Sequence, residues 1–186
     1  MTSSKTDPRI TRTRQLILDA FSELLHEKEF EDITVKDIAA KATVNRTTFY
    51  AHFEDKFLLL EYVITEAFTQ IVSNRIDPNT RISEESMRGL ILSMCDYQYT
   101  VFKECRIHFS SIASLIETAV RAKLQEIIVA MFANTHPAQE STRQNVLAII
   151  ISSAIYEATK YWVVEAQDMT PEALADEILA FSMPAR

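Results

Sequence analysis

The stretch ITVKDIAAKATVNRTTFYAHFEDKFLLL, residues 33–60, decides the fold of this chain. Thr34 stands just before a short apolar-periodic run and Asp37 follows three positions later, which is the pattern of a capping box at a helix start. Asn45 is a good N-cap for a second short helix, and Asp55 can cap a longer one. The stretch therefore predicts two short helices joined by a tight turn and followed by a long helix.

Helical periodicity continues on both sides of this stretch. Before it, Ile17, Phe21, Leu24 and Leu25 recur at helical spacing within residues 11–28. A single glycine and five prolines leave few places for turns, which favours long helices over strands. We therefore expect an all-α protein of about nine helices. The helices after the quoted stretch are expected at residues 55–75, 84–103, 106–112, 113–133 and 141–165, with a last one after Thr170-Pro171.

The two short helices differ in the way that a helix-turn-helix requires. The first has a small apolar face of Ile38, Ala39 and Ala42, which lets the second helix approach closely. The second carries polar and aromatic side chains that can face a DNA major groove and its phosphates. We infer a helix-turn-helix DNA-binding domain within residues 1–56.

These residues resemble the N-terminal signature of the tetracycline-repressor (TetR) family of bacterial regulators. The resemblance implies an N-terminal three-helix helix-turn-helix domain over residues 1–56 and a helical ligand-binding and dimerisation domain over residues 57–186. It also implies a transcriptional regulator and not an enzyme. The similarity runs without gaps from about Arg12 to Leu60 and includes Thr34, Asp37-Ile38-Ala39, Ala42, Val44, Thr48-Phe49-Tyr50, His52-Phe53 and Lys56.

The resemblance also implies which side chains contact DNA. Arg46 is expected in the major groove, where its guanidinium fork matches the two acceptors of guanine. Tyr50 and His52 match positions that touch phosphates, and Lys56 is expected to share a phosphate with the free amides at the start of the fourth helix. Phe49 is expected to face inward, as is Phe53. The expected DNA-contacting residues are Thr34, Asn45, Arg46, Thr47, Thr48, Tyr50, His52 and Lys56.

The charge distribution restricts where DNA can bind. The formal net charge is -7, and residues 1–56 hold nine bases and ten acids, so they contribute -1 and the remainder -6. An acidic body repels DNA, and any contact has to come from a localised basic face near the N-terminus. The N-terminal arginines Arg9, Arg12 and Arg14 could extend that contact as a loose arm.

Two local alternatives remain open within the motif. As an isolated surface residue, Arg46 would pair with Glu54 or Asp55 instead of DNA. The TetR family commonly has glycine at the positions of Glu29 and Thr43, where a left-handed backbone would cost a non-glycine residue about 1 kcal/mol.

Composition excludes several other kinds of protein. One glycine cannot build a phosphate-binding loop, and no nucleophile–base motif or cofactor signature is present, so we expect no catalytic residues and no cofactor. The four histidines show no paired ligand spacing, so no metal site is expected. Cys95 and Cys105 suit a reducing cytosol, with a redox pair as the alternative. The longest nearly apolar stretch, residues 146–155, is well short of the roughly 20 residues that span a bilayer, so the expected location is cytoplasmic, without a membrane partner.

The last two helices favour a homodimer. Residues 141–165 have almost no polar face around Val146–Ile151, so one side can pack on the core and the other on a second copy. The resemblance agrees, because the TetR family dimerises through its last two long helices. The residues expected at the interface are Ile151, Ile155, Ile178 and Phe181.

Polar residues within the apolar middle helices indicate a pocket for a small-molecule effector. Apolar walls with a few convergent polar groups are typical of such sites, although ordinary satisfied core residues have the same pattern. The residues expected in the pocket are Met94, Gln98, His108, Phe109, Ser153 and Tyr156.

Three functional hypotheses follow. The first is a ligand-responsive homodimeric repressor that binds a palindromic operator in double-stranded DNA. The second is a TetR-fold adaptor that acts mainly through a protein partner, which a large exposed apolar surface would favour. The third is an enzyme, which the missing catalytic motifs disfavour.

Overall fold

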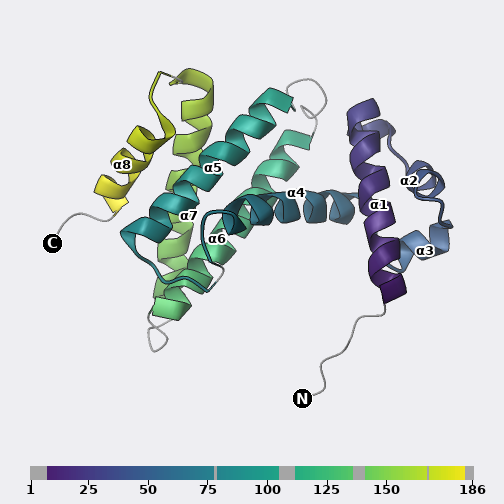
Figure 1. Cartoon of the computed structure of the whole chain (residues 1–186), viewed down its shortest axis with the longest axis horizontal. Coiled ribbons are helices and arrows are strands. Elements are labelled where there is room, and N and C mark those ends of the chain that lie inside the picture. The colour runs from purple at the N-terminus through teal and green to yellow at the C-terminus, as the bar shows by residue number, and fades with distance from the viewer. Residues whose placement is uncertain (1–7, 78, 105–111, 136–140, 167, 183–186) are drawn as a thin grey trace, which may run out of the picture. The chain divides into compact units, whose positions relative to one another are not determined.

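The computed structural model describes residues 8–77, 79–104, 112–135, 141–166 and 168–182, and every regular element among them is a helix (Figure 1). The all-α prediction is confirmed. Eight α-helices are present, and the ninth predicted one, residues 106–112, falls outside the described residues apart from its last position. A short 3-10 turn, η1, was not predicted. In order the elements are α1 (Pro8–Glu27), η1 (Phe30–Asp32), α2 (Val35–Lys41), α3 (Arg46–Tyr50), α4 (Lys56–Ser73), α5 (Glu84–Glu104), α6 (Ala113–Thr135), α7 (Ser141–Glu165) and α8 (Pro171–Ser182).

The chain divides into two compact units. The N-terminal unit runs through Val63 and the C-terminal unit begins at Ile64, so the division falls within α4, later than the boundary expected after residue 56. Ring contacts explain why the first turns of α4 belong to the N-terminal unit. The Phe57 ring lies 5.2 Å from that of Phe30, and the Tyr62 ring lies 5.9 Å from that of Phe53.

The core of the N-terminal unit is built on the predicted apolar stripe of α1. Ile17 and Phe21 on this stripe are completely buried. The Phe21 ring meets the Phe30 ring edge-on, with centroids 6.3 Å apart. Phe49 and Phe53 are buried as expected. Each such aromatic or aliphatic side chain contributes about 1.5–3 kcal/mol to folding, which allows helices as short as α2 and α3 to persist.

The C-terminal unit is built around α5, which packs against α7 and α8 (Figure 1). Met87, Leu90, Ile91 and Met94 form a completely or almost completely buried stripe on α5. Because these residues recur at three- and four-residue spacing, they lie on one face of the helix and provide the core between the packed helices.

The turn between α7 and α8 is held by a tryptophan. The indole Nε1 of Trp162 donates a hydrogen bond of 2.7 Å to the Met169 carbonyl. Thr170 then caps α8 as predicted, since its Oγ1 accepts a bond of 3.2 Å from the amide of Ala173. The two interactions fix the reversal of direction that brings α8 back against α7.

Helix α7 is long and apolar enough, by length and composition alone, to cross a membrane, with 25 residues and a mean hydropathy of 1.2 in its most apolar window. A core helix of a globular protein meets the same test. Ala148 and Ile155 of α7 are completely buried, and the helix packs on α5 and α8. Its composition is therefore weak evidence for a membrane span.

Candidate nucleic-acid interface

Thr34 and Asp37 form the predicted capping box at the start of α2. The Thr34 amide donates a 2.9 Å bond to Oδ2 of Asp37, and the Asp37 amide donates a 3.2 Å bond to Oγ1 of Thr34. The Thr34 hydroxyl also donates to Asp37, and Lys28 lies 3.2 Å from the same carboxylate. The bonds from Thr34, followed by that from Lys28, lower the pKa of Asp37 to about 2. The start of α2 is thus fixed by an ionised carboxylate.

Asn45 and Thr48 fix the start of α3 in the same way. Oδ1 of Asn45 accepts bonds of 2.7 Å from the Thr48 amide and 2.9 Å from the Thr48 hydroxyl. This confirms Asn45 as the N-cap. Arg46 and Thr47, which lie between these two residues, are exposed. The capping bonds therefore orient the exposed pair on the first turn of α3.

The guanidinium of Arg46 forms no ion pair with Glu54 or Asp55, the surface pairing that was the alternative to DNA contact. An exposed guanidinium carries five N–H donors, and those of Arg46 remain available to base edges or phosphates.

Tyr50 has its ring against a buried aromatic neighbour and is half exposed. Its ring meets the buried Phe49 edge-on, with centroids 5.5 Å apart, while 49% of the residue is exposed. His52, two residues after the end of α3, is half-buried. Both residues remain predicted phosphate contacts.

Lys56 lies in a different environment from the one expected for a phosphate ligand. Its Nζ donates to the carbonyls of Phe30, Glu31 and Ile33 at 2.9, 3.1 and 2.8 Å. These three bonds use all the N–H groups of the ammonium, which also lies 4.4 Å from the centre of the Phe30 ring. Burial lowers the pKa of Lys56, and the nearby Glu31 and Asp32 oppose that shift. A DNA phosphate would have to displace one of the carbonyls.

The amides at the start of α4 are also occupied. The Asp55 carboxylate accepts 2.8 Å bonds from the amides of Phe57 and Leu58, as its predicted capping role requires. The expectation that amides at this helix start share a phosphate with Lys56 stays a prediction, and a phosphate there would compete with the Asp55 carboxylate for two of them. Lys56 instead ties the start of α4 to the segment that leads into α2.

Several other cations of the N-terminal unit are neutralised or packed internally. Lys41 lies 3.1 Å from Glu23 and 2.6 Å from Glu27. The Arg14 guanidinium stacks on the rings of Phe53 and Tyr62 at 4.5 and 4.2 Å from their centres. Arg14 therefore belongs to α1, which begins at Pro8, and is not part of a loose arm.

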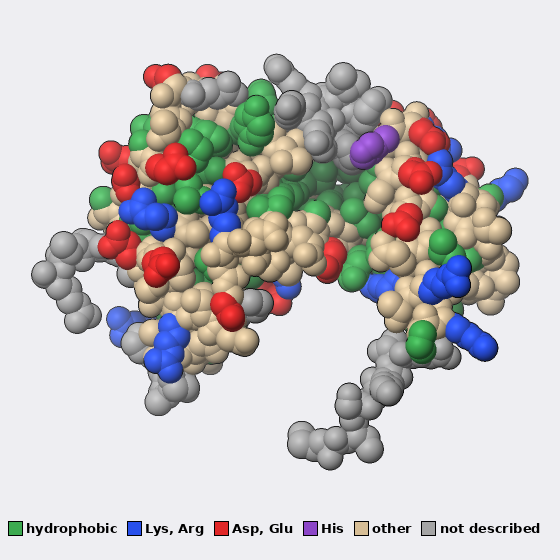
Figure 2. Space-filling view, viewed as in Figure 1, with side chains coloured by type: hydrophobic (Ala, Val, Ile, Leu, Met, Phe, Trp, Pro, Cys, Tyr) green, Lys and Arg blue, Asp and Glu red, His purple; other side chains and the backbone are tan. Residues whose placement is uncertain are grey.

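Lys36 is a candidate phosphate contact that sequence reasoning missed. It is exposed on the first turn of α2, and no ion pair holds it among the residues that the structure describes. Its position two residues after the Thr34 cap was the signal that could have identified it. On the face shown in Figure 2, Lys and Arg side chains are interspersed with Asp and Glu instead of forming one continuous basic patch. Specific contacts by a few cations are therefore more plausible than diffuse attraction.

The turn between α2 and α3 has the left-handed residue that the sequence raised as a possibility. Thr43 has a φ of 56°, whereas Glu29 has a φ of -61° and an extended backbone. The amides of Thr43 and Val44 bond to the carbonyls of Ala40 and Ala39 at 3.1 and 2.9 Å, which is the Schellman arrangement. The left-handed backbone that would favour glycine is thus present at Thr43 and absent at Glu29.

Of the residues expected in an effector pocket, three on α5 and α7 are buried in the C-terminal unit. Met94, Gln98 and Tyr156 are exposed by 0, 6 and 6%. Within the described chain, Nε2 of Gln98 is buried without a hydrogen-bond partner. Burial raises the pKa of Tyr156 to about 12, and the side chain of Gln98 lies near enough to lower it slightly. Ser153 is half-buried and accepts a 3.1 Å bond from Arg121. His108 and Phe109 lie outside the described residues.

The residues expected at a dimer interface have unequal exposure. Ile155 is completely buried in its own chain, so its side chain is not available to a second copy. Ile151 and Ile178 are half-buried, and Phe181 is 82% exposed. The helical periodicity of α7 turns other apolar residues outward instead. This exposed α7 face consists of Val146, Ile149, Ile150, Tyr161 and Val164.

Cys95 is buried on α5, and burial raises the pKa of its thiol to about 12. The thiol is therefore protonated and unreactive at neutral pH. Cys105 lies outside the described residues, so the question of a redox pair stays open.

Comparison with known proteins finds a family match in the N-terminal part of the chain. Residues 17–63 match the family of bacterial regulatory proteins called the tetR family. YxbF of Bacillus subtilis, named an HTH-type transcriptional regulator, is 26% identical over 183 residues, which are 94% of this chain and 46% of YxbF. DhaS of Lactococcus lactis, named a transcriptional activator of the dhaKLM operon, is 29% identical over 65 residues, or 35% of each chain. The chain thus spans less than half the length of these two relatives, which are named regulators and not enzymes.

Solved structures share the fold over nearly the whole chain. A TetR transcriptional regulator from Streptococcus agalactiae is 23% identical, with a TM-score of 0.59 over 95% of this chain and 96% of its own. FadR of Bacillus subtilis in complex with stearoyl-CoA is 20% identical, with a TM-score of 0.50 over 91% of this chain and 97% of its own. Residues 17–63, which contain α2 and α3, thus match the tetR family of bacterial regulatory proteins, and nearly the whole chain shares the fold of these solved structures.

Proposed function

We propose that the protein is a homodimeric transcriptional repressor of the cytoplasm that binds a palindromic DNA operator and releases it when a small molecule binds the C-terminal unit. The observation that supports DNA binding best is the first turn of α3. There Arg46 is exposed, and no described residue forms an ion pair with it, between two residues that fix the helix start. A guanidinium held in this way can read guanine in the major groove.

The proposed DNA contacts are fewer and more specific than the sequence suggested. Arg46 and Thr47 would read bases, and Tyr50, His52 and Lys36 would contact phosphates. Thr34 and Asn45 act first as helix caps, Thr48 donates to the Asn45 cap, and Lys56 acts as a positioning residue. One helix-turn-helix offers few cations to DNA. Tight binding therefore needs two copies on successive major grooves, which implies a palindromic site.

The exposed α7 face supports a dimer. Val146, Ile149 and Ile150 are each about half exposed, and Phe181 on α8 is almost wholly exposed. Apolar patches of this kind mark interfaces between proteins. Two copies joined through α7 and α8 would bury them and carry two recognition helices.

Two observations support control by a small molecule. The amide of Gln98 is buried beside the hydroxyl of Tyr156, and its Nε2 has no hydrogen bond of good geometry in the described chain. FadR, which shares the fold, was solved with stearoyl-CoA bound. We infer that an effector with a hydrogen-bond acceptor binds beside Gln98, Met94 and Tyr156.

Activation is the second candidate function, and the name of DhaS as an activator favours it. In that case the exposed α7 face would carry a protein partner, and the protein would act as an adaptor. Transcript levels from the bound operator distinguish the two candidates, because a repressor lowers them and an activator raises them.

DNA binding is tested by selecting bound fragments from genomic DNA and measuring affinity for the strongest site by fluorescence anisotropy. Arg46→Ala should weaken binding to that site about 5- to 150-fold and relax base preference at one position of each half-site. Arg46→Lys should restore charge but not that preference. Arg81→Ala, an exposed arginine of the C-terminal unit, is the matched control. Recovery of no enriched sequence would refute the proposal.

Dimerisation is tested by analytical ultracentrifugation of an Ile150→Asp variant. A carboxylate in the centre of the exposed α7 face should give a monomer with weakened operator binding. Leu115→Asp places the same charge on an exposed apolar residue of α6 and should leave the dimer intact. If both variants sediment like the unmodified protein, the α7 face is not the interface.

A further inference from the structure

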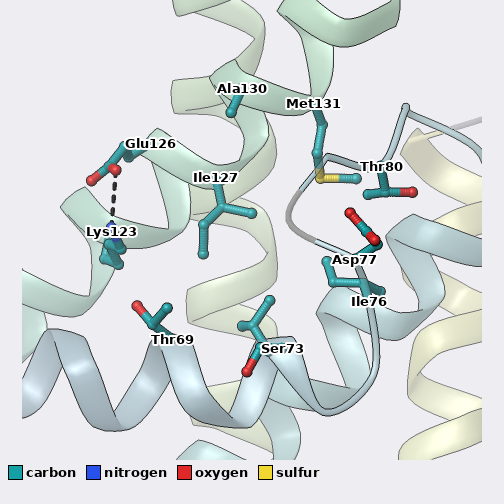
Figure 3. Close-up of a pocket in the computed structure, with 11 residues that line it drawn as sticks. Thr69, Ser73, Ile76, Asp77, Thr80, Lys123, Glu126, Ile127, Ala130 and Met131 are labelled. Atoms are coloured by element: carbon teal, nitrogen blue, oxygen red, sulfur yellow. Dashed lines mark hydrogen bonds and ion pairs between the residues drawn. The ribbon is translucent and has the colours of Figure 1, made fainter. Parts of the chain in front are cut away.

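A second candidate ligand site lies in the C-terminal unit, away from the residues expected in the effector pocket. It is a cavity of about 190 Å³ formed by the C-terminal half of α4, the connector that leads to α5 and the C-terminal half of α6 (Figure 3). None of Met94, Gln98, Ser153 and Tyr156 lines it. Nothing so far described uses this cavity.

The floor of the cavity is apolar. Val72, Ile76, Ile127 and Met131 all line it, and Figure 3 shows the side chains of Ile76, Ile127 and Met131 directed into the space between the three segments. An apolar cavity of about 150 Å³ is known to hold benzene. A cavity of this size therefore suits a ligand with one ring or a chain of similar volume.

The side of the cavity formed by the connector between α4 and α5 depends on Gly89, the only glycine of the sequence. A Cβ on Gly89 of α5 would lie 2.5 Å from Cγ2 of Ile76, so glycine permits the connector to approach α5 this closely. The stiff, β-branched Ile76 is thereby seated against a helix backbone. The adjacent Arg75 is tied to Asp96 of α5 by a 2.6 Å ion pair. The wall that carries Ile76 is therefore anchored to α5 before any ligand arrives.

The polar rim of the cavity offers acceptors. The hydroxyls of Thr69 and Ser73 donate to carbonyls of their own helix at 2.6 and 2.9 Å, so each can only accept a further hydrogen bond. A ligand that brings its own N–H donors matches such a rim.

The charges of the rim point to the same ligand. Lys123 is neutralised by Glu126 at 2.9 Å, whereas Asp77 has no cationic partner among the residues that the structure describes. Asp77 accepts a 2.6 Å bond from the Asn79 amide, which keeps the connector folded. Figure 3 shows Asp77 across the cavity from the Lys123–Glu126 pair. One carboxylate thus lies unneutralised beside an apolar floor.

We propose that this cavity binds a small organic cation, a primary ammonium on a single apolar ring or a chain of similar size. The ammonium lies at Asp77, and the apolar part contacts Ile76, Ile127 and Met131. Asp77 sits at an exposed rim, so its charge contributes a modest factor of about three to five in affinity. This inference does not rest on DNA binding, and its failure would leave the proposed function untouched.

The test uses three probes of equal size with the full chain: benzylammonium, benzyl alcohol and benzoate. Each is titrated at millimolar concentrations while backbone amide chemical shifts are recorded by NMR. We expect shifts at residues 69–80 and 123–131, with benzylammonium binding about three to five times more tightly than benzyl alcohol and benzoate more weakly than both. Shifts confined to other residues, or benzoate binding as tightly as benzylammonium, would overturn the proposal.

Three variants sharpen the test. Asp77→Asn keeps an oxygen for the Asn79 amide and should reduce benzylammonium binding to the level of benzyl alcohol. Asp168→Asn makes the same change at an exposed residue outside the cavity and should have no effect. Ala130→Leu should fill the cavity and weaken all three probes. If Asp77→Asn binds benzylammonium like the unmodified chain, the assignment of the cation is wrong.

Discussion

Replacing Thr43 by glycine should raise the free energy of unfolding of the N-terminal unit by about 1 kcal/mol. Thr43 is exposed and has a φ of 56°, in the region that costs a residue with a Cβ about 1–2 kcal/mol. Glycine removes that cost, although its greater freedom in the unfolded chain returns about 0.4–1 kcal/mol. Both bonds of the Schellman turn come from backbone amides and should survive the substitution.

Glu29→Gly is the matched control. The family commonly has glycine at both positions, but Glu29 has a φ of -61°, which any residue adopts. Glycine there adds its entropy cost and also removes the Glu29 side chain, so it should lower stability by at least about 0.5 kcal/mol. The two variants therefore change stability in opposite directions.

The assay is thermal unfolding followed by circular dichroism, combined with native-state hydrogen exchange. For a small unit a change of 1 kcal/mol moves Tm by about 4–8 °C, and exchange of the α2 amides reports the N-terminal unit separately. If Thr43→Gly leaves α2 less protected than in the unmodified protein, or if Glu29→Gly stabilises it equally, the argument from backbone conformation is refuted.

Three further predictions concern single interactions. The pKa of Asp37 is lowered from 3.8 to about 2, so its carboxylate stabilises the fold fully above about pH 4 and loses that effect as the pH falls toward 2. Asp37→Asn should therefore lower Tm at neutral pH, and the difference from the unmodified protein should shrink at about pH 3; an equal difference at both pH values would contradict this. Lys56→Met removes bonds to three carbonyls and should cost about 1–3 kcal/mol in urea unfolding, and an unchanged urea midpoint would exclude the positioning role. Trp162→Phe removes the bond to the Met169 carbonyl and should cost about 1–2 kcal/mol, measured by calorimetry because the chain has no other tryptophan; an unchanged Tm would show that the bond is dispensable.

Interactions between near neighbours along the chain were predictable from the printed residues. A cap joins residues two or three positions apart, so Thr34, Asn45, Asp55 and Thr170 could be identified as caps before any tertiary contact was known. The apolar spacing on α1 likewise predicted its buried face, because that spacing fixes which side chains share a side of the helix. The helix-turn-helix was recognisable for the same reason.

Tertiary structure alone decided the roles of residues whose partners are distant in sequence. Lys56 bonds to carbonyls 23 to 26 positions away, and only folding brings its ammonium to them. On a helix as apolar as α7, composition predicts burial without saying which residues face inward, and packing on α5 and α8 buried Ile155 while leaving Ile150 exposed. The cavity at Asp77 is lined by segments about fifty residues apart, and no sequence pattern indicates that they meet. Capping and periodicity are short-range consequences of backbone geometry, whereas partner choice and exposure depend on how the helices pack.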